Sequence, residues 1–308
     1  MVTVFLDKNP SCPNEEKYKA IGRDKEGALA CMVSSDGIHF YKGWQMTKEG
    51  KFDTHNIAFW NPEQNQYIGY IRDFHDVPGN DLNAGVRDVR WMISKDFKTW
   101  TKPQLLDFYG KEDYPLYTNE IQPYPRAPHI FIGLPSRYVE RHEWTNNYDQ
   151  LAGTELRKKI CKVHPRYGLT TTDCILIISR DGKHFNRFDE ALIRPGIERV
   201  NNWVYGDCYP ATGFTETKNV LKDAPDEYSL YCVENHWRMI PAQLRRYSFR
   251  KDGLASYNAS YGERKLVTLL ITFSGNEMEL NFETSARGYV YVKIISQHEG
   301  ELESCELF

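Results

Sequence analysis

Short runs of apolar residues, rich in β-branched and aromatic side chains, alternate along the chain with turns of Gly, Pro, Asn and Asp. Runs of this length and composition are typical of β-strands. The clearest predicted strands lie at 28–34, 57–60, 67–72, 89–94, 129–134, 174–179, 228–233 and 289–295. Only residues 148–162, where Leu, Ala and Ile alternate with charges, predict a helix. The pattern therefore predicts an all-β protein.

One turn motif recurs three times in the form S-x-D-(G/F)-x-x-(F/W), at residues 34–40, 94–100 and 179–185. In each copy a strand ends in Ser, the Asp caps its own turn, and an aromatic residue opens the next strand. The copies start 60 and 85 residues apart, and repeats at such periods indicate a β-propeller or a similar array. Three coincidental hairpin turns are the alternative.

Three predicted strands are each preceded by polar and aromatic residues, in segments 52–60, 117–124 and 203–210. The innermost strand of a propeller blade lines the central axis, so its leading residues lie at the mouth of the channel. We expect the three segments to deliver side chains to one axial pocket. With one further blade in the first 51 residues, the spacing predicts about four blades.

From about Ser256 the turn motif is lost, and compact strands are expected at 265–273, 278–284 and 288–295. This stretch is too short for a complete β-sandwich of about seven strands. We therefore expect a β-propeller at residues 1–255, followed by a β-sandwich portion at residues 256–308.

Composition and charge narrow the kinds of partner that the chain is expected to bind. Hydrophobic residues make up 41% and charged residues 26% of the chain, and the formal net charge is −3. This balance gives no electrostatic reason to expect a nucleic acid or an anionic membrane as partner. No apolar run is long enough to span a bilayer, and no signal peptide is visible. The sequence leaves the oligomeric state open.

The seven cysteines form no C-x-x-C pair and no Cys/His cluster, which argues against a structural zinc site. Free buried thiols are expected instead. They favour a cytoplasmic location slightly, although the compartment is otherwise unknown.

Hydrolysis of a glycosidic bond needs two carboxylates placed across the sugar. Asp53 and Asp207 precede predicted inner strands, and Glu234 ends the strand expected to pair with the Asp207 segment. We predict that Glu234 is the general acid and Asp53 the nucleophile or base, while Asp207 holds the sugar ring or tunes the acid. For each of the three, capping of a turn is the structural alternative.

Binding candidates are the polar and aromatic residues of the same segments. An arginine fork suits sugar hydroxyls, a uronate or a sulfate, with a salt bridge to Asp73 or Asp88 as the alternative for Arg72. Aromatic residues stack on sugar faces or pack in the core. No close pair of histidines gives metal-ligand spacing, so neither a metal nor a cofactor is predicted. The predicted substrate-binding residues are His55, Asn56, Arg72, Asn119, Gln122, Trp203, Tyr205, His236 and Trp237.

The S-x-D-G turns, the F-D-T-H-N-I-A-F-W-N-P-x-x-x-x-Y-x-x-Y-x-R block at 52–72 and the W-V-Y-G-D-x-Y-P segment at 203–210 resemble five-bladed β-propeller glycosidase-like proteins. More narrowly, the chain is similar to a bacterial group labelled glycosyl hydrolase family 32 N-terminal-like, related in architecture to families 32 and 43. The resemblance covers nearly the whole chain, and it implies a five-bladed propeller followed by a β-sandwich. The chain is short for that plan, so we expect an incomplete or truncated relative.

The family 32 motifs match only in part. Asp53 lacks the W-M-N-D-P context, Arg72-Asp73-Phe74 is not R-D-P, and Glu234 is not followed by Cys. The leading hypothesis is a carbohydrate-active glycoside hydrolase that takes a glycan terminus into the axial pocket. A non-catalytic glycan-binding propeller is one alternative. A metal-dependent sugar-modifying enzyme, such as a deacetylase, is the other.

Overall fold

The computed structural model describes residues 1–82, 84–235, 241–296 and 300–307. By its internal contacts the chain divides into two compact units. Unit 1 comprises residues 1–217 and 228–248, and unit 2 comprises residues 218–227 and 249–308. The division expected at residues 255 and 256 stays a prediction.

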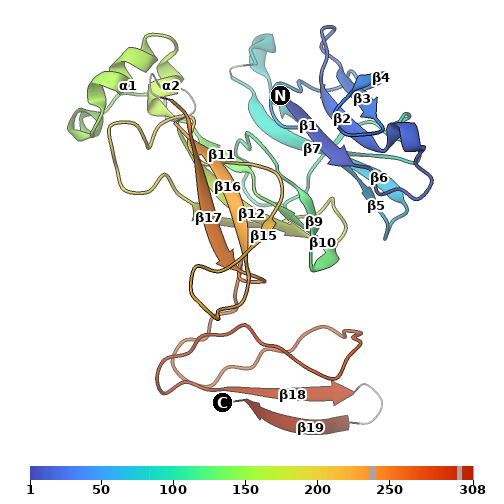
Figure 1. Ribbon diagram of the computed structural model, residues 1–308. Coiled ribbons are helices and arrows are strands. Elements are labelled where there is room, and N and C mark those ends of the chain that lie inside the picture. The colour runs from blue at the N-terminus through green and yellow to red at the C-terminus, as the bar shows by residue number, and fades with distance from the viewer. Residues whose placement is uncertain (83, 236–240, 297–299, 308) are drawn as a thin grey trace. The chain divides into compact units, whose positions relative to one another are not determined.

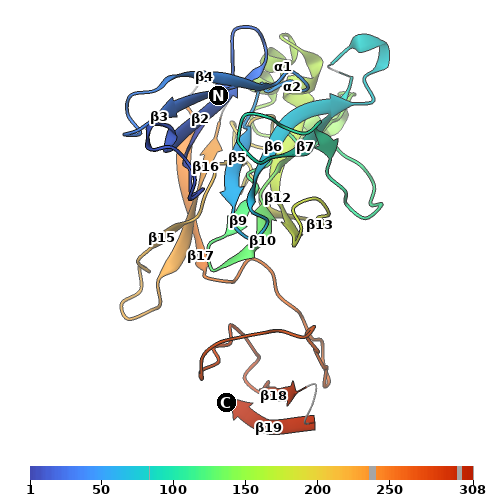
Figure 2. The same cartoon turned by 90° about the vertical axis from the view of Figure 1, so that its right-hand side faces the viewer.

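Four antiparallel sheets form a β-propeller-like ring, and they follow one another along the chain (Figures 1 and 2). Sheet 1 contains β1 (Val2–Leu6), β2 (Tyr18–Arg23), β3 (Leu29–Ser34) and β4 (Tyr41–Thr47). Sheet 2 contains β5 (Ile57–Asn61), β6 (Gln66–His75), β7 (Val86–Ser94) and β8 (Gln104–Leu105). In both sheets the strands pair in chain order.

Sheets 3 and 4 each contain a strand that pairs with three others. Sheet 3 contains β9 (Gln122–Tyr124), β10 (Ala127–Gly133), β11 (Ser136–Val139), β12 (Thr171–Ser179) and β13 (Asn186–Ile193), and β10, β11 and β13 all pair with β12. Sheet 4 contains β14 (Tyr209–Pro210), β15 (Thr215–Thr217), β16 (Glu227–Glu234) and β17 (Gln243–Arg250), and the other three strands pair with β16. The predicted all-β class and the four sheets are confirmed. A fifth blade, which the family resemblance implied, is not found among the described residues.

The few helical segments are short. The connection between β11 and β12 holds α1 (Thr154–Cys161) and α2 (Pro165–Leu169). The predicted helix at 148–162 is interrupted because Gly153 has a φ of 75°, in the left-handed region that ends a helix. Three 3₁₀ turns complete the set: η1 (Asn14–Glu16), η2 (Pro78–Asn80) and η3 (Asn146–Gln150).

The core of unit 1 lies between neighbouring sheets, and β6 shows why its strands are apolar on both faces. Tyr67 and Ile71 point into a cluster shared with sheet 1, whereas Ile68 and Tyr70 point into a cluster shared with sheet 3. Successive side chains of a strand alternate between its two faces. A strand packed between two sheets must therefore be apolar at consecutive positions.

The three S-x-D turns join the last two strands of sheets 1, 2 and 3, namely β3 to β4, β7 to β8 and β12 to β13, as the repeat predicted. In each turn the Ser hydroxyl donates to the Asp side chain, at 2.9, 3.0 and 3.0 Å. The same Asp oxygen accepts two backbone N–H groups at 2.7–2.9 Å. The hydrogen bond from the Thr99 backbone, with that from Lys98, lowers the pKa of Asp96 to about 2.

The position after the Asp has a positive φ in all three turns: 77° at Gly37, 64° at Phe97 and 79° at Gly182. Gly adopts this conformation without strain, which explains why two of the copies use it. The Gly182 carbonyl also accepts a 2.8 Å hydrogen bond from the buried Tyr70 hydroxyl of sheet 2. The turn of sheet 3 is thus part of the packing against sheet 2.

In unit 2, β18 (Val290–Ser296) pairs with β19 (Gly300–Leu307). The strand expected at 288–295 is confirmed as β18, but those expected at 265–273 and 278–284 are wrong, because these residues are assigned no strand. Their side chains are largely exposed, Leu269 by 81% and Phe273 by 69%. An apolar run supplies β-propensity, but without a pairing partner it forms no ladder. The β-sandwich is not confirmed.

Replacement of Asp181 by Ala removes the acceptor that holds the third S-x-D turn. We expect the free energy of unfolding to fall by about 1 kcal/mol, the usual net value of such hydrogen bonds. Asp181→Asn keeps an acceptor oxygen and should lose less. Urea unfolding of the whole chain measures the loss of unfolding free energy in both variants. Glu190→Ala, a change at an exposed position on β13, is the control. Equal stability of Asp181→Ala and the parent would contradict this role.

Candidate functional site

The three polar and aromatic segments predicted to converge do meet in unit 1. The Thr54 hydroxyl donates to the Tyr117 carbonyl at 3.3 Å, and the Asn119 side-chain amide donates to the His55 carbonyl at 3.1 Å. The third segment joins them through Tyr205, whose hydroxyl donates to that of Tyr117 at 2.7 Å. We call this meeting point the axial junction. Its residues are Thr54, His55, Tyr117, Asn119, Glu120, Tyr205, Tyr209 and Thr212.

The axial junction contains a buried carboxylate that the sequence analysis did not select. Both oxygens of Glu120 lie within 2.8 Å of Nδ1 of His55, and Oε2 accepts a 2.6 Å hydrogen bond from the Thr212 hydroxyl. The side chain of Glu120 is 2% exposed and that of His55 is 14% exposed. Glu120 also has a φ of 46°, which is unusual for a residue with a side chain. The position of Glu120 between two selected residues, Asn119 and Gln122, was the only available signal.

Aromatic rings fill the other part of the junction. Tyr117 stacks on Tyr209 with ring centres 5.4 Å apart and on Tyr138 at 5.8 Å. Tyr205 stacks in turn on Tyr167 at 5.4 Å. Burial, together with the neighbouring Tyr117, raises the pKa of Tyr205. Tyr205 is therefore packed among other rings, with 5% of its surface exposed.

Arg72 lies beside the junction and is also buried. Its guanidinium stands 4.2 Å from the ring centre of Phe74 and 5.3 Å from that of Tyr117. Burial lowers its pKa, and Asp53, whose Oδ1 lies 3.9 Å from Nε, opposes that effect. The ion pair of Arg72 is therefore with Asp53 and not with Asp73 or Asp88, the partners named in the alternative; Asp73 accepts from Arg72 through its backbone carbonyl at 2.8 Å. Arg72 is 2% exposed, whereas the Asp53 side chain is 46% exposed.

Two predicted binding amides are engaged with backbone groups. Asn56 donates to the carbonyl of Thr54 at 3.0 Å and accepts from the N–H of Arg72 at 3.0 Å. Asn119 accepts from the N–H of Ile121 at 3.2 Å in addition to its bond to His55. These amides shape the segments, and any contact they make with a ligand stays a prediction. Gln122 is half-buried on β9.

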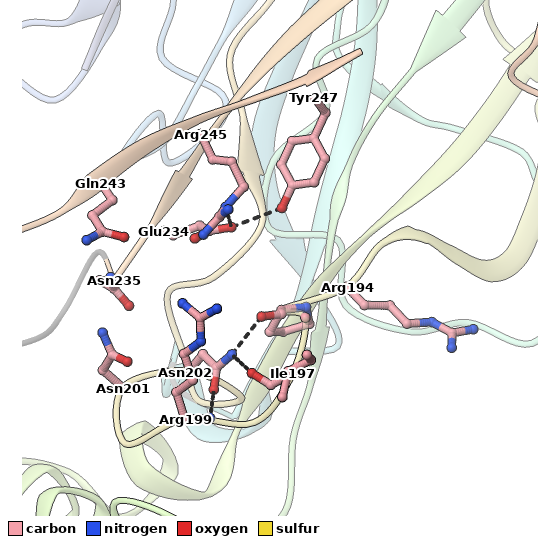
Figure 3. A pocket seen from close by; sticks show the side chains of 12 residues that line it. Arg194, Ile197, Arg199, Asn201, Asn202, Glu234, Asn235, Gln243, Arg245 and Tyr247 are labelled. Carbon is pink, nitrogen blue, oxygen red and sulfur yellow. Dashed lines mark hydrogen bonds and ion pairs between the residues drawn. The ribbon is translucent and has the colours of Figure 1, made fainter. Parts of the chain in front are cut away.

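A separate pocket of about 250 Å³ surrounds Glu234 (Figure 3). Glu234 ends β16, and the neighbouring strand β17 supplies Arg245 and Tyr247. Nε of Arg245 donates to Oε1 of Glu234 at 2.7 Å, and the Tyr247 hydroxyl donates to the same oxygen at 2.9 Å. The Glu234 side chain is 12% exposed. The twelve lining residues are Arg194, Pro195, Gly196, Ile197, Arg199, Asn201, Asn202, Glu234, Asn235, Gln243, Arg245 and Tyr247.

The loop that forms one wall of this pocket follows β13 and is tied by its own side chains. Asn202 donates to the carbonyls of Pro195 and Ile197, both at 2.7 Å. Trp203 donates from its indole N–H to the Gly196 carbonyl at 2.7 Å, and its predicted stacking on a sugar stays a prediction. Arg157 of α1 donates to the Trp203 carbonyl at 2.8 Å. The helical insertion of sheet 3 thus anchors the pocket loop.

Asp207 lies beside the Glu234 pocket. Its carboxylate accepts a 3.4 Å hydrogen bond from the backbone N–H of Asn235, which lines the pocket. Its backbone N–H donates to the Thr172 hydroxyl at 3.0 Å, and its carbonyl accepts from that hydroxyl at 2.8 Å. With 1% of its surface exposed, Asp207 lies behind the pocket wall.

The structure brings the predicted residues together in two groups. Glu234, Asp207 and Trp203 lie at or behind the pocket, whereas Asp53, His55, Arg72, Asn119 and Tyr205 lie at or beside the junction. No contact within the described part of the chain joins the carboxylates of Asp53 and Glu234. His236 and Trp237 lie outside the described residues.

Metal ligands, thiols and membrane spans are the remaining candidate features. No group of three or more His, Cys, Asp or Glu with metal-binding geometry occurs among the residues that the structure describes. Six of the seven cysteines are free thiols, and four of these six are buried. Within the described ranges, no helix is long and apolar enough to cross a membrane.

Comparison with known proteins gives distant matches of structure alone. No protein-family profile and no curated protein sequence matches the chain. One similar solved structure is an N-acetylgalactosamine deacetylase from F. plautii in complex with blood group B trisaccharide, at 10% identity and a TM-score of 0.42 over 80% of this chain and 70% of that one. Another is a BT0996–RGII complex, at 12% identity and a TM-score of 0.43 over 78% of this chain and 64% of that one. The match thus spans less than two thirds of the second structure's length.

The contact between Glu120 and Thr212 joins residues 92 positions apart, so it should contribute to the packing of the junction. We expect Glu120→Gln and Thr212→Val each to lower the free energy of unfolding by about 1–2 kcal/mol, because each leaves a buried polar group with a poorer partner. A double-mutant cycle should give a coupling of at least about 0.5 kcal/mol. Glu63→Gln on the surface is the control. Additive effects of the two changes would contradict a direct interaction.

Proposed function

We propose that this protein is carbohydrate-active and that it takes one sugar residue of a glycan into the Glu234 pocket. The observation that carries the proposal is the lining of the pocket, where nine of the twelve residues present a polar side chain. Arginine and amide groups donate hydrogen bonds, and the Glu234 carboxylate and the amide oxygens accept them. A sugar needs both, because each of its hydroxyls donates and accepts.

The size of the pocket and the hydrogen bonds that hold its loop wall support the same proposal. A volume of about 250 Å³ lies just below the range of about 300–1,000 Å³ that is usual for drug-sized ligands, which suits a single sugar residue. Tyr247 adds an aromatic side chain to the lining. The hydrogen bonds of Asn202 and Trp203 hold the loop wall in place before a ligand arrives, which reduces the entropy lost on binding.

Glu234→Gln tests this proposal. The amide removes the charge that pairs with Arg245 and replaces one acceptor oxygen with a donor, so we expect glycan affinity to fall at least about tenfold, or roughly 1.4 kcal/mol. Isothermal titration against a panel of monosaccharides and oligosaccharides measures the loss, and circular dichroism checks the fold. Glu190→Gln, an exposed change on β13, should bind as the parent does. A parent protein that binds no sugar in the panel would overturn the proposal.

Glycoside hydrolysis is a second candidate, and the position of Glu234 favours it. Oε1 of Glu234 carries both donors, and within the described residues no hydrogen bond occupies Oε2. That oxygen can face a glycosidic bond. The general-acid role of Glu234 and the roles of Asp53 and Asp207 stay predictions. Glu234 is the single carboxylate among the described lining residues, which favours binding without turnover as the leading proposal.

Product release separates the two candidates. If the protein hydrolyses its glycan, Glu234→Gln and Asp53→Asn should each lower turnover by about 10²–10⁴-fold, the usual contribution of an acid–base group. Chromatography of glycans incubated with the parent and both variants measures this. Binding without any product would overturn hydrolysis and leave the binding proposal standing. Full activity in Asp53→Asn would remove Asp53 from the mechanism.

A further inference from the structure

The Glu234 pocket carries more positive than negative charge. Three arginines line it against one carboxylate, and a guanidinium stays protonated at any physiological pH. The charge of Glu234 is already matched by Arg245, at 2.7 Å. The hydrogen bond to Glu234 raises the pKa of Arg245. Among the described lining residues, no further carboxylate is present to pair with Arg194 or Arg199.

The guanidinium of Arg199 is the one directed toward Glu234. Figure 3 shows its side chain directed from the loop toward Glu234, whereas the side chain of Arg194 is directed away. Among the described residues, the Arg199 guanidinium makes neither an ion pair nor a hydrogen bond. The neighbouring Glu198 is used elsewhere, because its carboxylate accepts the N–H of Ala152 at 2.6 Å.

The backbone beneath Arg199 is fixed. Its N–H donates to Oδ1 of Asn202 at 2.6 Å, and the amide of Asn202 holds the carbonyls of Pro195 and Ile197. One side chain thus ties three points of the loop. A guanidinium on such a base offers a planar fork of donors that matches a carboxylate in a bidentate arrangement.

We infer that the sugar residue bound in the Glu234 pocket is a uronic acid, whose carboxylate pairs with Arg199. This inference rests on the proposed function and names its substrate class. The charge of Glu234 fixes the orientation, because two carboxylates side by side would repel each other. The ligand carboxylate therefore lies toward Arg199, and the ring hydroxyls face Glu234.

Matched pairs of sugars test the inference. Galacturonic acid against galactose, and glucuronic acid against glucose, differ only in the carboxylate. We expect each acid to bind the parent about tenfold more tightly than its neutral partner, as an added charged hydrogen-bonding pair allows. Raising NaCl from about 0.05 to 0.5 M should shrink this advantage, because Arg199 is exposed and its charge is screened. Ligand-observed NMR titrations cover the weak affinities of monosaccharides.

Two arginine variants test whether Arg199 is the residue that pairs with the ligand carboxylate. Arg199→Gln should remove the preference for the acid, so that the acid and its neutral partner bind the variant with affinities within about twofold of each other. Arg194→Gln lies on the same loop and removes the same charge, but its side chain points away, so it should keep most of the preference. Equal loss in both variants would overturn the assignment to Arg199 and leave only a general charge effect.

The remaining outcomes separate this inference from the proposed function. If acidic and neutral sugars bind equally well, the uronic-acid inference is wrong and the proposed function stands. If no sugar binds, both are wrong. Galactose 6-sulfate forms the third arm. If it binds more tightly than galacturonic acid, the pocket selects a sulfate ester and the inference of a carboxylate is wrong.

Discussion

The packing of each sheet against its neighbour is the constraint on which the rest of unit 1 depends. β6 illustrates it, since its alternate residues enter two different cores. Once sheets 1, 2 and 3 are stacked in this way, the chain segments that lead into sheets 2, 3 and 4 are drawn together. The polar groups of those segments must then satisfy one another, because an unpaired polar group in a buried position is costly. The bonds among Thr54, Tyr117 and Tyr205 meet this requirement.

The same constraint explains why the candidate functional residues fall into two groups, one at the axial junction and one at the Glu234 pocket. At the axial junction, His55, Glu120 and Thr212 use their polar atoms on one another. In the Glu234 pocket, the contacts among the described residues leave polar atoms without a hydrogen-bond partner, above all on Arg199. A protein group can bind a ligand strongly only where its own fold leaves it a donor or acceptor to offer. This makes the pocket the better binding candidate, although the sequence motifs pointed to the axis.

The sequence predicted features that depend on local chemistry. The S-x-D turns were predictable because Ser, Asp and a left-handed residue determine the turn among neighbours in the chain. Most strands of unit 1 were predictable from composition, as was the convergence of three segments once a propeller was assumed. Glu234 was selected correctly as a residue at the end of a strand and is now found in a pocket. Its catalytic role stays a prediction.

Features that depend on distant partners were missed. The predicted convergence of segments brings the entries to sheets 3 and 4 together, but nothing near either residue shows that Glu120 pairs with Thr212. Arg72 illustrates the opposite failure, because a long basic side chain at a strand end suggests solvent and ligand, whereas Phe74 and Tyr117 enclose it. Residues 265–273 have strand composition but no strand partner. In each case the deciding energy comes from packing between segments, to which composition gives no access.

The balance of charge around Glu234 bears on catalysis as well as on binding. Arg245 and Tyr247 both donate to Oε1 of the carboxylate, so among the described residues Oε2 is the oxygen left to meet a ligand. Hydrolysis needs a second carboxylate across the sugar, and Glu234 is the single carboxylate among the described lining residues. A binding role needs no second carboxylate, since Glu234 as an acceptor and Arg199 as a donor already provide both halves of a site for an acidic sugar.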